Sequence, residues 1–107
     1  MQTTFTQRVW ELGISIPEGR VTTYGAIAKA AGAGGQAARS VSSILGKYPN
    51  QRVVPWHRVV YAGGKVWLSD EHETKRRELY ELEGIYVNEK GIIKDFEEIF
   101  FDFSELT

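Results

Sequence analysis

The sequence contains no cysteine among its 107 residues. This absence excludes disulfide bonds, thiolate metal sites and any mechanism that uses a thiol nucleophile. Histidine is nearly as scarce, because only His57 and His72 are present, and no carboxylates stand at a spacing that would complete a zinc site with them. We therefore expect neither a metal nor a cofactor.

Long apolar runs are also missing. No stretch of about 18 apolar residues occurs, so no membrane span is expected, and residues 1–9 lack the basic-then-apolar layout of a secretory signal. A cytoplasmic location is the resulting expectation. The content of 42% hydrophobic and 25% charged residues is typical of a folded soluble protein, and the length predicts a single domain over residues 1–107.

The net charge of −1 hides an uneven distribution of charge along the chain. Residues 1–77 hold 11 Lys or Arg and 5 acidic residues, whereas residues 78–107 hold 2 and 9. One interpretation is a basic binding face with an acidic flank, which ends in an acidic tail at residues 95–107. The alternative is that both halves are ordinary solvated surface, and charge alone does not separate the two.

Three helices are expected in the first half of the chain. Apolar residues recur at helical spacing over residues 3–12, and Thr3 or Thr4 would cap this helix. A second, short helix is expected to end at Ala31, and a third to run over residues 36–45. A glycine-rich turn joins these two helices, which is typical of a helix-turn-helix.

Small hairpins and one helix are expected in the second half. The pattern over residues 59–67 predicts a hairpin, and residues 85–93 predict a second, smaller one. Between them, a helix over residues 71–83 would bury Leu79 and Leu82.

The outer face of the helix at 36–45 carries mostly small side chains. Arg39 is its single long, charged residue. A surface of this kind allows the helix to approach another backbone closely, either that of a binding partner or that of a neighbouring helix in the same protein. The small residues of this face are Ala37, Ala38, Ser40, Ser42 and Ser43.

Five short motifs, in the same order and at similar spacing, resemble the C-terminal DNA-binding domain of O6-alkylguanine-DNA alkyltransferases over roughly residues 3–93. They are Ile16-Pro17-Glu18-Gly19, Thr23-Tyr24-Gly25, Ala37-Ala38-Arg39-Ser40-Val41, Pro55-Trp56-His57-Arg58-Val59 and Leu82-Glu83-Gly84. That family carries Pro-Cys-His-Arg, whereas Trp56 stands here in the cysteine's place, so the chain is more similar to the alkyltransferase-like proteins. The resemblance implies a mixed fold, mainly α with small β-hairpins, around a winged-helix-like helix-turn-helix.

The substitution of tryptophan for cysteine removes the chemistry of the repair enzymes. In those enzymes a histidine, oriented by a glutamate, activates a thiolate that accepts the alkyl group. His57 and Glu83 match that pair, but an indole offers no basic nucleophilic atom. We expect the pair to remain as a structural hydrogen bond, with proton transfer as the alternative, and the protein to be no enzyme.

Binding to DNA is the function that the resemblance leaves in place. The helix-turn-helix of the family enters the minor groove, where Gln36, Ala37, Ser40 and Ser42 would contact the DNA backbone. Arg39 matches the arginine that fills the gap left by an extruded base, since a planar guanidinium stacks and donates hydrogen bonds there. Without the resemblance, Arg39 would be interpreted as a solvated or salt-bridged residue of the helix.

The resemblance also implies a pocket for the extruded base. Tyr24 matches the tyrosine that helps to rotate the nucleotide, Trp56 would form a wall of the pocket, and the backbone near Val59 would read the guanine amino group. Asp70 belongs to a segment that borders the alkyl group in the family, but residues 67–71 depart here from the family's glycine-rich pattern. A core tyrosine at position 24 and a core tryptophan at position 56 are the structural alternatives.

The expected function is that of a damage sensor. The protein would bind, as a monomer, double-stranded DNA that contains O6-alkylguanine, flip the damaged base, transfer no alkyl group, and recruit nucleotide excision repair proteins. Two alternatives remain: a sequence-specific helix-turn-helix transcription regulator that reads the major groove, and a residual enzyme that uses Trp56, His57 or Glu83.

Overall fold

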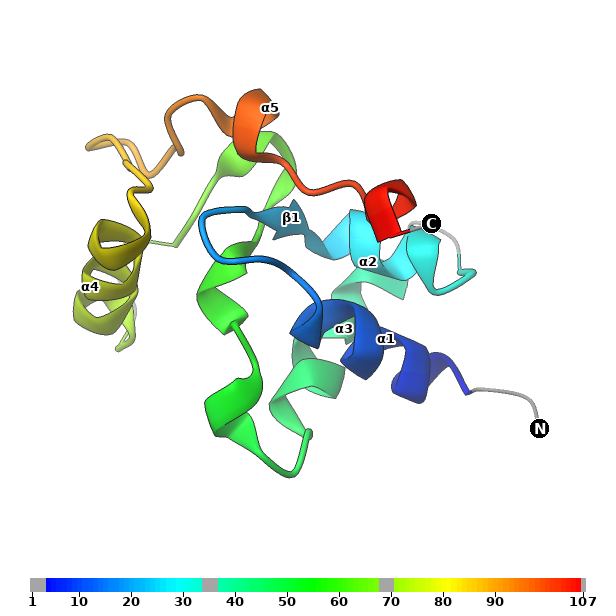
Figure 1. Cartoon of the computed structure of the whole chain (residues 1–107). Coiled ribbons are helices and arrows are strands. Elements are labelled where there is room, and N and C mark those ends of the chain that lie inside the picture. The colour runs from blue at the N-terminus through cyan, green and yellow to red at the C-terminus, as the bar shows by residue number, and fades with distance from the viewer. Residues whose placement is uncertain (1–3, 34–36, 68–70, 107) are drawn as a thin grey trace.

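The N-terminal half of the chain folds into three short helices that pack against one another (Figure 1). The computed structural model describes residues 4–33, 37–67 and 71–106. The helices are α1 (Phe5–Ile14), α2 (Tyr24–Ala30) and α3 (Ala38–Gly46), close to the predicted ranges. Among the described residues, no helix is both long and apolar enough to cross a membrane.

Local capping fixes where α1 begins. The Thr4 side chain accepts a hydrogen bond from the backbone N–H of Gln7, and the Gln7 side chain accepts one from the backbone N–H of Thr4. This reciprocal pair satisfies two N–H groups that the first turn of a helix leaves unpaired. Thr23 caps α2 in a similar way through the N–H of Ala26. The prediction of a threonine cap at α1 is confirmed for Thr4, whereas Thr3 lies outside the described residues.

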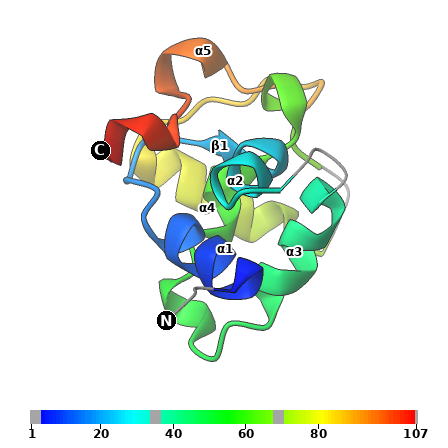
Figure 2. The ribbon, with the colours of Figure 1, turned by 90° about the vertical axis from the view of Figure 1, so that its right-hand side faces the viewer.

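One apolar core joins α1, α2 and α3. Val9, Ile27 and Val41 are completely buried between the three helices, and Leu45 is nearly so. α1 approaches α3 closely at Gly13, where an added Cβ would come within 2.6 Å of the Leu45 side chain. Figure 2 shows the three helices next to one another. The predicted helix-turn-helix is therefore formed by α2 and α3.

A short parallel sheet connects the helices to the rest of the molecule. Strand β1 (Thr22–Thr23) pairs in parallel with β2 (Val59–Val60), which follows directly on the 3-10 turn η3 (Trp56–Arg58). The predicted hairpin over residues 59–67 is confirmed only in its turn, where Tyr61 bridges Lys65 in antiparallel register. The strand that leads into this turn has its parallel partner in β1 instead, a pairing across more than 30 residues.

Helix α4 (Glu73–Glu83) lies at the far side of the molecule from α1 (Figure 1). It ends at Gly84, whose φ of 73° is the left-handed conformation that glycine adopts without strain. The prediction that Leu82 is buried is wrong, because its side chain is 79% exposed. Tyr80 is the buried residue of this helix at 3% exposure, and position 82 lies about 200° around the helix from it, toward solvent.

Two aromatic residues of the acidic tail belong to the core. After α5 (Phe96–Ile99), Phe100 bridges Val21 beside β1, and Phe101 and Phe103 insert between the helices of the first core. Arg20 holds this segment from the outside, since its guanidinium donates to the carbonyls of Ile99 and Phe100 and pairs with Glu105 at 2.8 Å. The turn η5 (Phe103–Leu106) follows.

We expect Phe101→Leu to lower the free energy of unfolding by about 1–2 kcal/mol, because Phe101 is only 3% exposed and the smaller side chain leaves part of its site empty. Urea unfolding of the full chain measures this change. Leu82→Ala is the control, and it should change stability by less than about 0.5 kcal/mol, since Leu82 faces solvent. An effect of Phe101→Leu no larger than that of the control would contradict the packing of the tail.

Candidate nucleic-acid interface

Helix α3 presents its polar residues outward. Val41 and Leu45 face the core, so Arg39, Ser40 and Ser42 are exposed on the opposite side. Within the described part of the chain, no hydrogen bond or ion pair engages the Arg39 guanidinium. Ala37 is half-buried at the start of α3, and Gln36, which was predicted to contact DNA, lies outside the described residues.

A cavity of about 640 Å³ opens beside this helix. Residues from α2, α3, η3, β2 and α4 line it, so the fold brings together segments that are far apart in the sequence. Four residues that the sequence analysis selected share its wall: Tyr24, Ser42, Trp56 and Val59. Asp70, which was predicted to lie in the same pocket, falls outside the described residues.

Aromatic and cationic side chains gather around Trp56. The His72 ring lies 5.4 Å from the Trp56 ring, and the Arg76 guanidinium carbon lies 5.4 Å from the centre of the same ring. Nη1 of Arg76 donates a hydrogen bond of 2.5 Å to the carbonyl of Trp67. Elsewhere on the cavity wall, the ring of Tyr24 contacts that of Tyr61 at 5.4 Å.

Sequence reasoning missed Trp67, His72 and Arg76 as individual members of this wall. The departure from the family pattern over residues 67–71 was the one available signal in the sequence. Nothing local in the sequence connects position 56 with position 76, which meet only because α4 packs beside η3.

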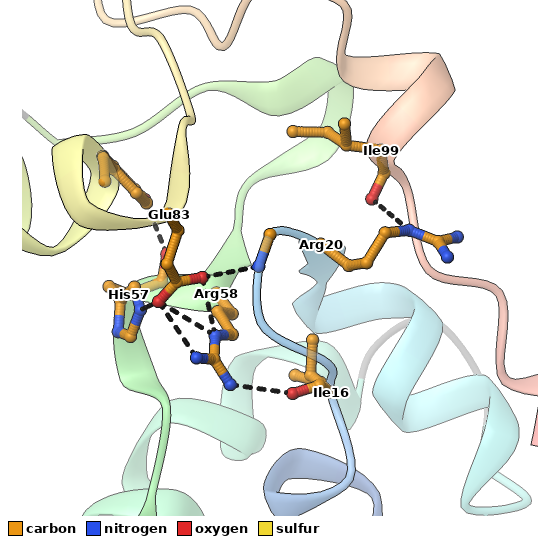
Figure 3. A network of polar contacts seen from close by, with 8 residues as sticks. Ile16, Arg20, His57, Arg58, Glu83 and Ile99 are labelled. Carbon is orange, nitrogen blue, oxygen red and sulfur yellow. Dashed lines mark hydrogen bonds and ion pairs between the residues drawn. The ribbon is translucent and has the colours of Figure 1, made fainter.

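The carboxylate of Glu83 is the centre of a polar network behind the cavity (Figure 3). It accepts the Nε2–H of His57 at 2.5 Å, two arms of the Arg58 guanidinium at 2.9 and 3.0 Å, and the backbone N–H of Gly19 at 2.8 Å. Arg58 also donates to the carbonyl of Ile16 at 2.9 Å. One carboxylate thereby ties α4 to η3 and to the turn before β1.

Sequence reasoning named His57 and Glu83 but gave Arg58 no role. Arg58 stands in the quoted motif Pro55-Trp56-His57-Arg58-Val59, and its side chain is 18% exposed. Because the positive charge of Arg58 already compensates the negative charge of Glu83, His57 beside them need not be protonated.

The network shifts two pKa values. Burial is the largest influence on Glu83 and would raise its pKa, but the hydrogen bonds from Arg58, Gly19 and His57 together outweigh it and hold the pKa below the usual range of a carboxyl group. Burial lowers the pKa of His57, against the opposing influence of Glu83. His57 is therefore neutral near pH 7 and donates from Nε2 to an ionised Glu83.

The second ring nitrogen of His57 is left as an acceptor. Nδ1 is buried and has no hydrogen-bond partner among the described residues. The backbone of His57 is held as well, since the Tyr80 hydroxyl donates to its carbonyl at 2.6 Å, and burial raises the pKa of Tyr80 so that the hydroxyl keeps its proton. The imidazole is thus fixed in place, and its Nδ1 faces no described group that it could activate.

Acidification from pH 7 to pH 5 should lower the free energy of unfolding. The pKa of His57 is lowered in the folded chain and near 6.5 in the unfolded chain, so below about pH 6.5 the unfolded chain binds more protons. The contribution of His57 to the free energy of unfolding is therefore present above that pH. It is lost as the pH falls toward the pKa of His57 in the folded chain. Urea unfolding at pH 7, 6 and 5 measures it, above the range in which Glu83 itself titrates.

His57→Gln should flatten this pH dependence, whatever it does to stability at pH 7. His72→Gln is the matched control, because the His72 side chain is 59% exposed and outside the Glu83 network, and the slope should persist in it. An identical slope in the protein and in His57→Gln would contradict the assignment to His57.

Comparison with known proteins agrees with this geometry. The family model of the 6-O-methylguanine DNA methyltransferase, DNA binding domain, matches residues 4–85. The DNA base-flipping protein of Escherichia coli K12 is 43% identical over 89 residues, which are 83% of this chain and 68% of that protein.

Two solved structures are similar over most of the chain. S. pombe Atl1 in complex with damaged DNA containing O6-carboxymethylguanine is 30% identical, with a TM-score of 0.73 over 94% of this chain and 98% of that one. Mycobacterium tuberculosis OGT in complex with DNA is 42% identical, with a TM-score of 0.61 over 78% of this chain and 51% of that one. The match of the family model over most of the chain, together with these relatives, shows that the protein belongs to the family of the 6-O-methylguanine DNA methyltransferase DNA-binding domain.

Proposed function

We propose that this protein is a non-enzymatic sensor of O6-alkylguanine in double-stranded DNA. α3 enters the minor groove, Tyr24 helps to rotate the damaged nucleotide out of the helix, and Arg39 takes its place in the stack. The flipped base then occupies the cavity beside Trp56. The single observation that carries the proposal is this cavity, which opens next to the exposed face of α3 and is lined by Tyr24, Trp56 and Val59.

The size and lining of the cavity suit a flipped base. Its volume of about 640 Å³ lies within the range of roughly 300–1,000 Å³ that small-molecule sites occupy. Trp56 offers an apolar face to an alkyl group, and the backbone near Val59 offers carbonyl groups to the guanine amino group. Extrusion of a base costs a few kcal/mol and costs least for a weakly paired lesion, which contributes to selectivity.

The outer face of α3 suits the minor groove better than the major groove. Its exposed residues Ser40 and Ser42 are short, so the helix backbone can come close to the DNA backbone. A regulator that reads the major groove needs several long side chains that reach base edges, and Arg39 is the only one on the described outer face of α3.

The proposal excludes alkyl transfer because the chain has no acceptor for the group. Transfer requires a nucleophile that displaces guanine O6 from the alkyl carbon, and the indole of Trp56 has no basic lone pair for this step. The sequence contains no cysteine elsewhere. In the cavity the lesion would be held and not changed.

A lesion that is held but not repaired requires a second system to remove it. We include in the proposal that the monomeric protein acts in the cytoplasm and that its complex with damaged DNA recruits nucleotide excision repair proteins. The resemblance to alkyltransferase-like proteins supports this step.

The proposal is tested by measuring affinity for matched duplexes that contain guanine or O6-methylguanine at one position, at a single salt concentration. We expect tighter binding to the damaged duplex, and equal affinities would contradict a sensor. Selection from random duplex sequences addresses the regulator, because a defined preferred sequence would favour that function over ours.

Trp56→Cys is expected to leave methylated DNA unrepaired. The indole is the ring on which His72 and Arg76 pack, so its removal changes the pocket around the new thiol as well as supplying it. The measurement is the mass of the variant after incubation with an O6-methylguanine duplex. Efficient gain of one methyl group would contradict this expectation and would show that the pocket is still arranged for transfer.

A further inference from the structure

The middle of the chain carries charge of one sign only. Between Glu18 and Asp70 the sequence contains no acidic residue but seven Lys or Arg. The net charge of the whole protein is −1, so this concentration of positive charge is a local feature. The segment includes α2, α3, η3 and β2, which are the elements that build most of the candidate interface.

Three of these seven cations have an acidic neighbour in the fold, and Arg39 already has a role in the proposed function. The three pairs are Arg20 with Glu105, Arg58 with Glu83 and Lys29 with Asp102. Lys47, Arg52 and Lys65 remain. All three are exposed, and among the described residues none forms an ion pair or hydrogen bond with their side-chain nitrogens. Their charges are therefore available to an outside partner.

The three remaining cations lie at the rim of the cavity. Lys65 is one of the residues that line it. Lys47 and Arg52 each follow directly on a lining residue, which is Gly46 at the end of α3 for the first and Gln51 for the second. A partner that covers the mouth of the cavity would therefore meet all three charges.

Two separate parts of the chain contribute to this rim. In Figure 1 residues 47–53 form the loop at the bottom of the view, below α3, whereas residues 61–65 lie near α5 at the top. Gly64 agrees with the second position, because an added Cβ there would come within 2.8 Å of the Phe96 side chain in α5. The lining of the cavity includes residues from both parts. Positive charge thus flanks the cavity on two sides.

We infer that Lys47, Arg52 and Lys65 form a phosphate-binding rim, which holds the DNA backbone on either side of the cavity mouth whether or not the duplex contains a lesion. The inference deepens the proposed function and rests on it, because it requires DNA to lie across α3 with a nucleotide turned toward the cavity. A flipped nucleotide stays linked to its strand through the phosphates before and after it, so both phosphates lie near the cavity mouth. A cation on each side matches that arrangement.

Contacts of this kind act on every duplex alike. A phosphate carries a full negative charge and condensed counterions, and a Lys or Arg that neutralises it releases those counterions into solution. Such a contact positions the protein on DNA but reads neither sequence nor an alkyl group. The preference for a damaged base therefore stays with the cavity and Arg39, while the rim supplies affinity that salt weakens.

The test measures Kd for two duplexes of one sequence, with guanine or O6-methylguanine at one position, at several salt concentrations between about 0.05 and 0.3 M. We expect Lys47→Gln, Arg52→Gln and Lys65→Gln each to lower the slope of log Kd against log salt concentration by about 0.9, the value for one phosphate contact on duplex DNA. Since the electrostatic contribution vanishes toward 1 M salt, this change corresponds to about eightfold weaker binding at 0.1 M. Both duplexes should lose the same factor, so the ratio of their affinities stays unchanged.

Lys75→Gln is the matched control, because Lys75 is 65% exposed, pairs with Glu78 on α4 at 4.0 Å and does not line the cavity. It should leave the salt slope unchanged. Lys65→Arg and Arg52→Lys keep the positive charge and should keep the slope as well. The substituted side chains are all exposed, so each variant should unfold in urea at the same midpoint as the unchanged protein, which separates a lost contact from lost folding.

The outcomes separate the rim from the sensor. Slopes equal to that of Lys75→Gln in all three variants, with the damaged duplex still bound more tightly, would overturn the rim and leave the proposed function intact, and such a slope in one variant would remove that residue from the rim. A loss of affinity for the damaged duplex alone would also overturn the rim, because the residue would then contact the flipped base and not a phosphate. Equal affinity of the unchanged protein for both duplexes would contradict the sensor, whereas lowered slopes in the three variants would still support the rim.

Discussion

Arg39→Ala should weaken binding to an O6-methylguanine duplex by about 30- to 100-fold, which corresponds to about 2–3 kcal/mol. Arg39 is exposed on α3, and no described residue pairs with its guanidinium. In the proposed complex this planar group fills the gap that the flipped base leaves and donates hydrogen bonds to the orphaned base. Alanine offers neither, so the open gap would favour return of the base to the stack.

Two further variants separate this role from general charge. Arg39→Lys keeps the positive charge but loses the planar fork, so it should restore only a small part of the affinity. Arg77→Ala removes a charge on α4, away from α3, and should change binding to the damaged duplex by less than about threefold. Affinity for the damaged duplex that is unchanged in Arg39→Ala would reject the role of Arg39 in the stack.

Glu83→Ala should lower the free energy of unfolding at pH 7 by about 3–5 kcal/mol. The carboxylate compensates the charge of Arg58, whose side chain is only 18% exposed, and satisfies His57 and the N–H of Gly19. Its removal leaves a largely buried cation and two donors without partners. A loss of this size is a large fraction of the stability of a small domain.

Glu81→Ala is the control for this prediction, because Glu81 is exposed on the same helix. It should change stability by less than about 0.5 kcal/mol in the same urea titration. If Glu83→Ala lowers the free energy of unfolding by less than about 1 kcal/mol, the hydrogen-bond network of Glu83 does not hold α4 to η3. The role of His57 and Glu83 as a structural pair would then lose its physical basis.

Local sequence signals predicted α1, α2, α3 and α4 well, but they did not predict α5. The threonine cap at α1, the helix-turn-helix of α2 and α3 and the glycine at the end of α4 all depend on neighbouring residues, which the sequence displays directly. Burial on α4 was less predictable. Leu82 looked like a core residue by its chemistry. The side of α4 that is buried depends on residues far away in the sequence, however, and it is Tyr80 that packs with Val21, Val60 and other apolar residues.

In the tail and the sheet, contacts between residues far apart in the sequence determine the structure. The charges of residues 95–107 obscured the pattern of Phe101 and Phe103, which enter the core of helices more than 50 residues earlier in the chain. The parallel pairing of β1 with β2 has the same character, since each strand is two residues long and carries no pairing signal of its own. Chain-distant pairing of this kind is set by the packed fold and not by local pattern.

In the candidate site, too, residues within local motifs were predicted, whereas residues placed by long-range packing were not. The family motifs predicted Tyr24, Arg39, Trp56 and His57 as site residues, because those residues stand inside short recognisable segments. Arg76 stands in no such segment, and its position over Trp56 depends on how α4 packs beside η3.

We propose that this protein binds an alkylated guanine without repairing it, and a single incubation tests this proposal most directly. Stoichiometric protein is mixed with an O6-methylguanine duplex, the complex is isolated, and the masses of the protein and of the recovered DNA strand are measured after several hours. The account predicts a complex from which both components return with unchanged mass. A protein heavier by one methyl group, or a DNA strand that has lost its methyl group, would contradict it.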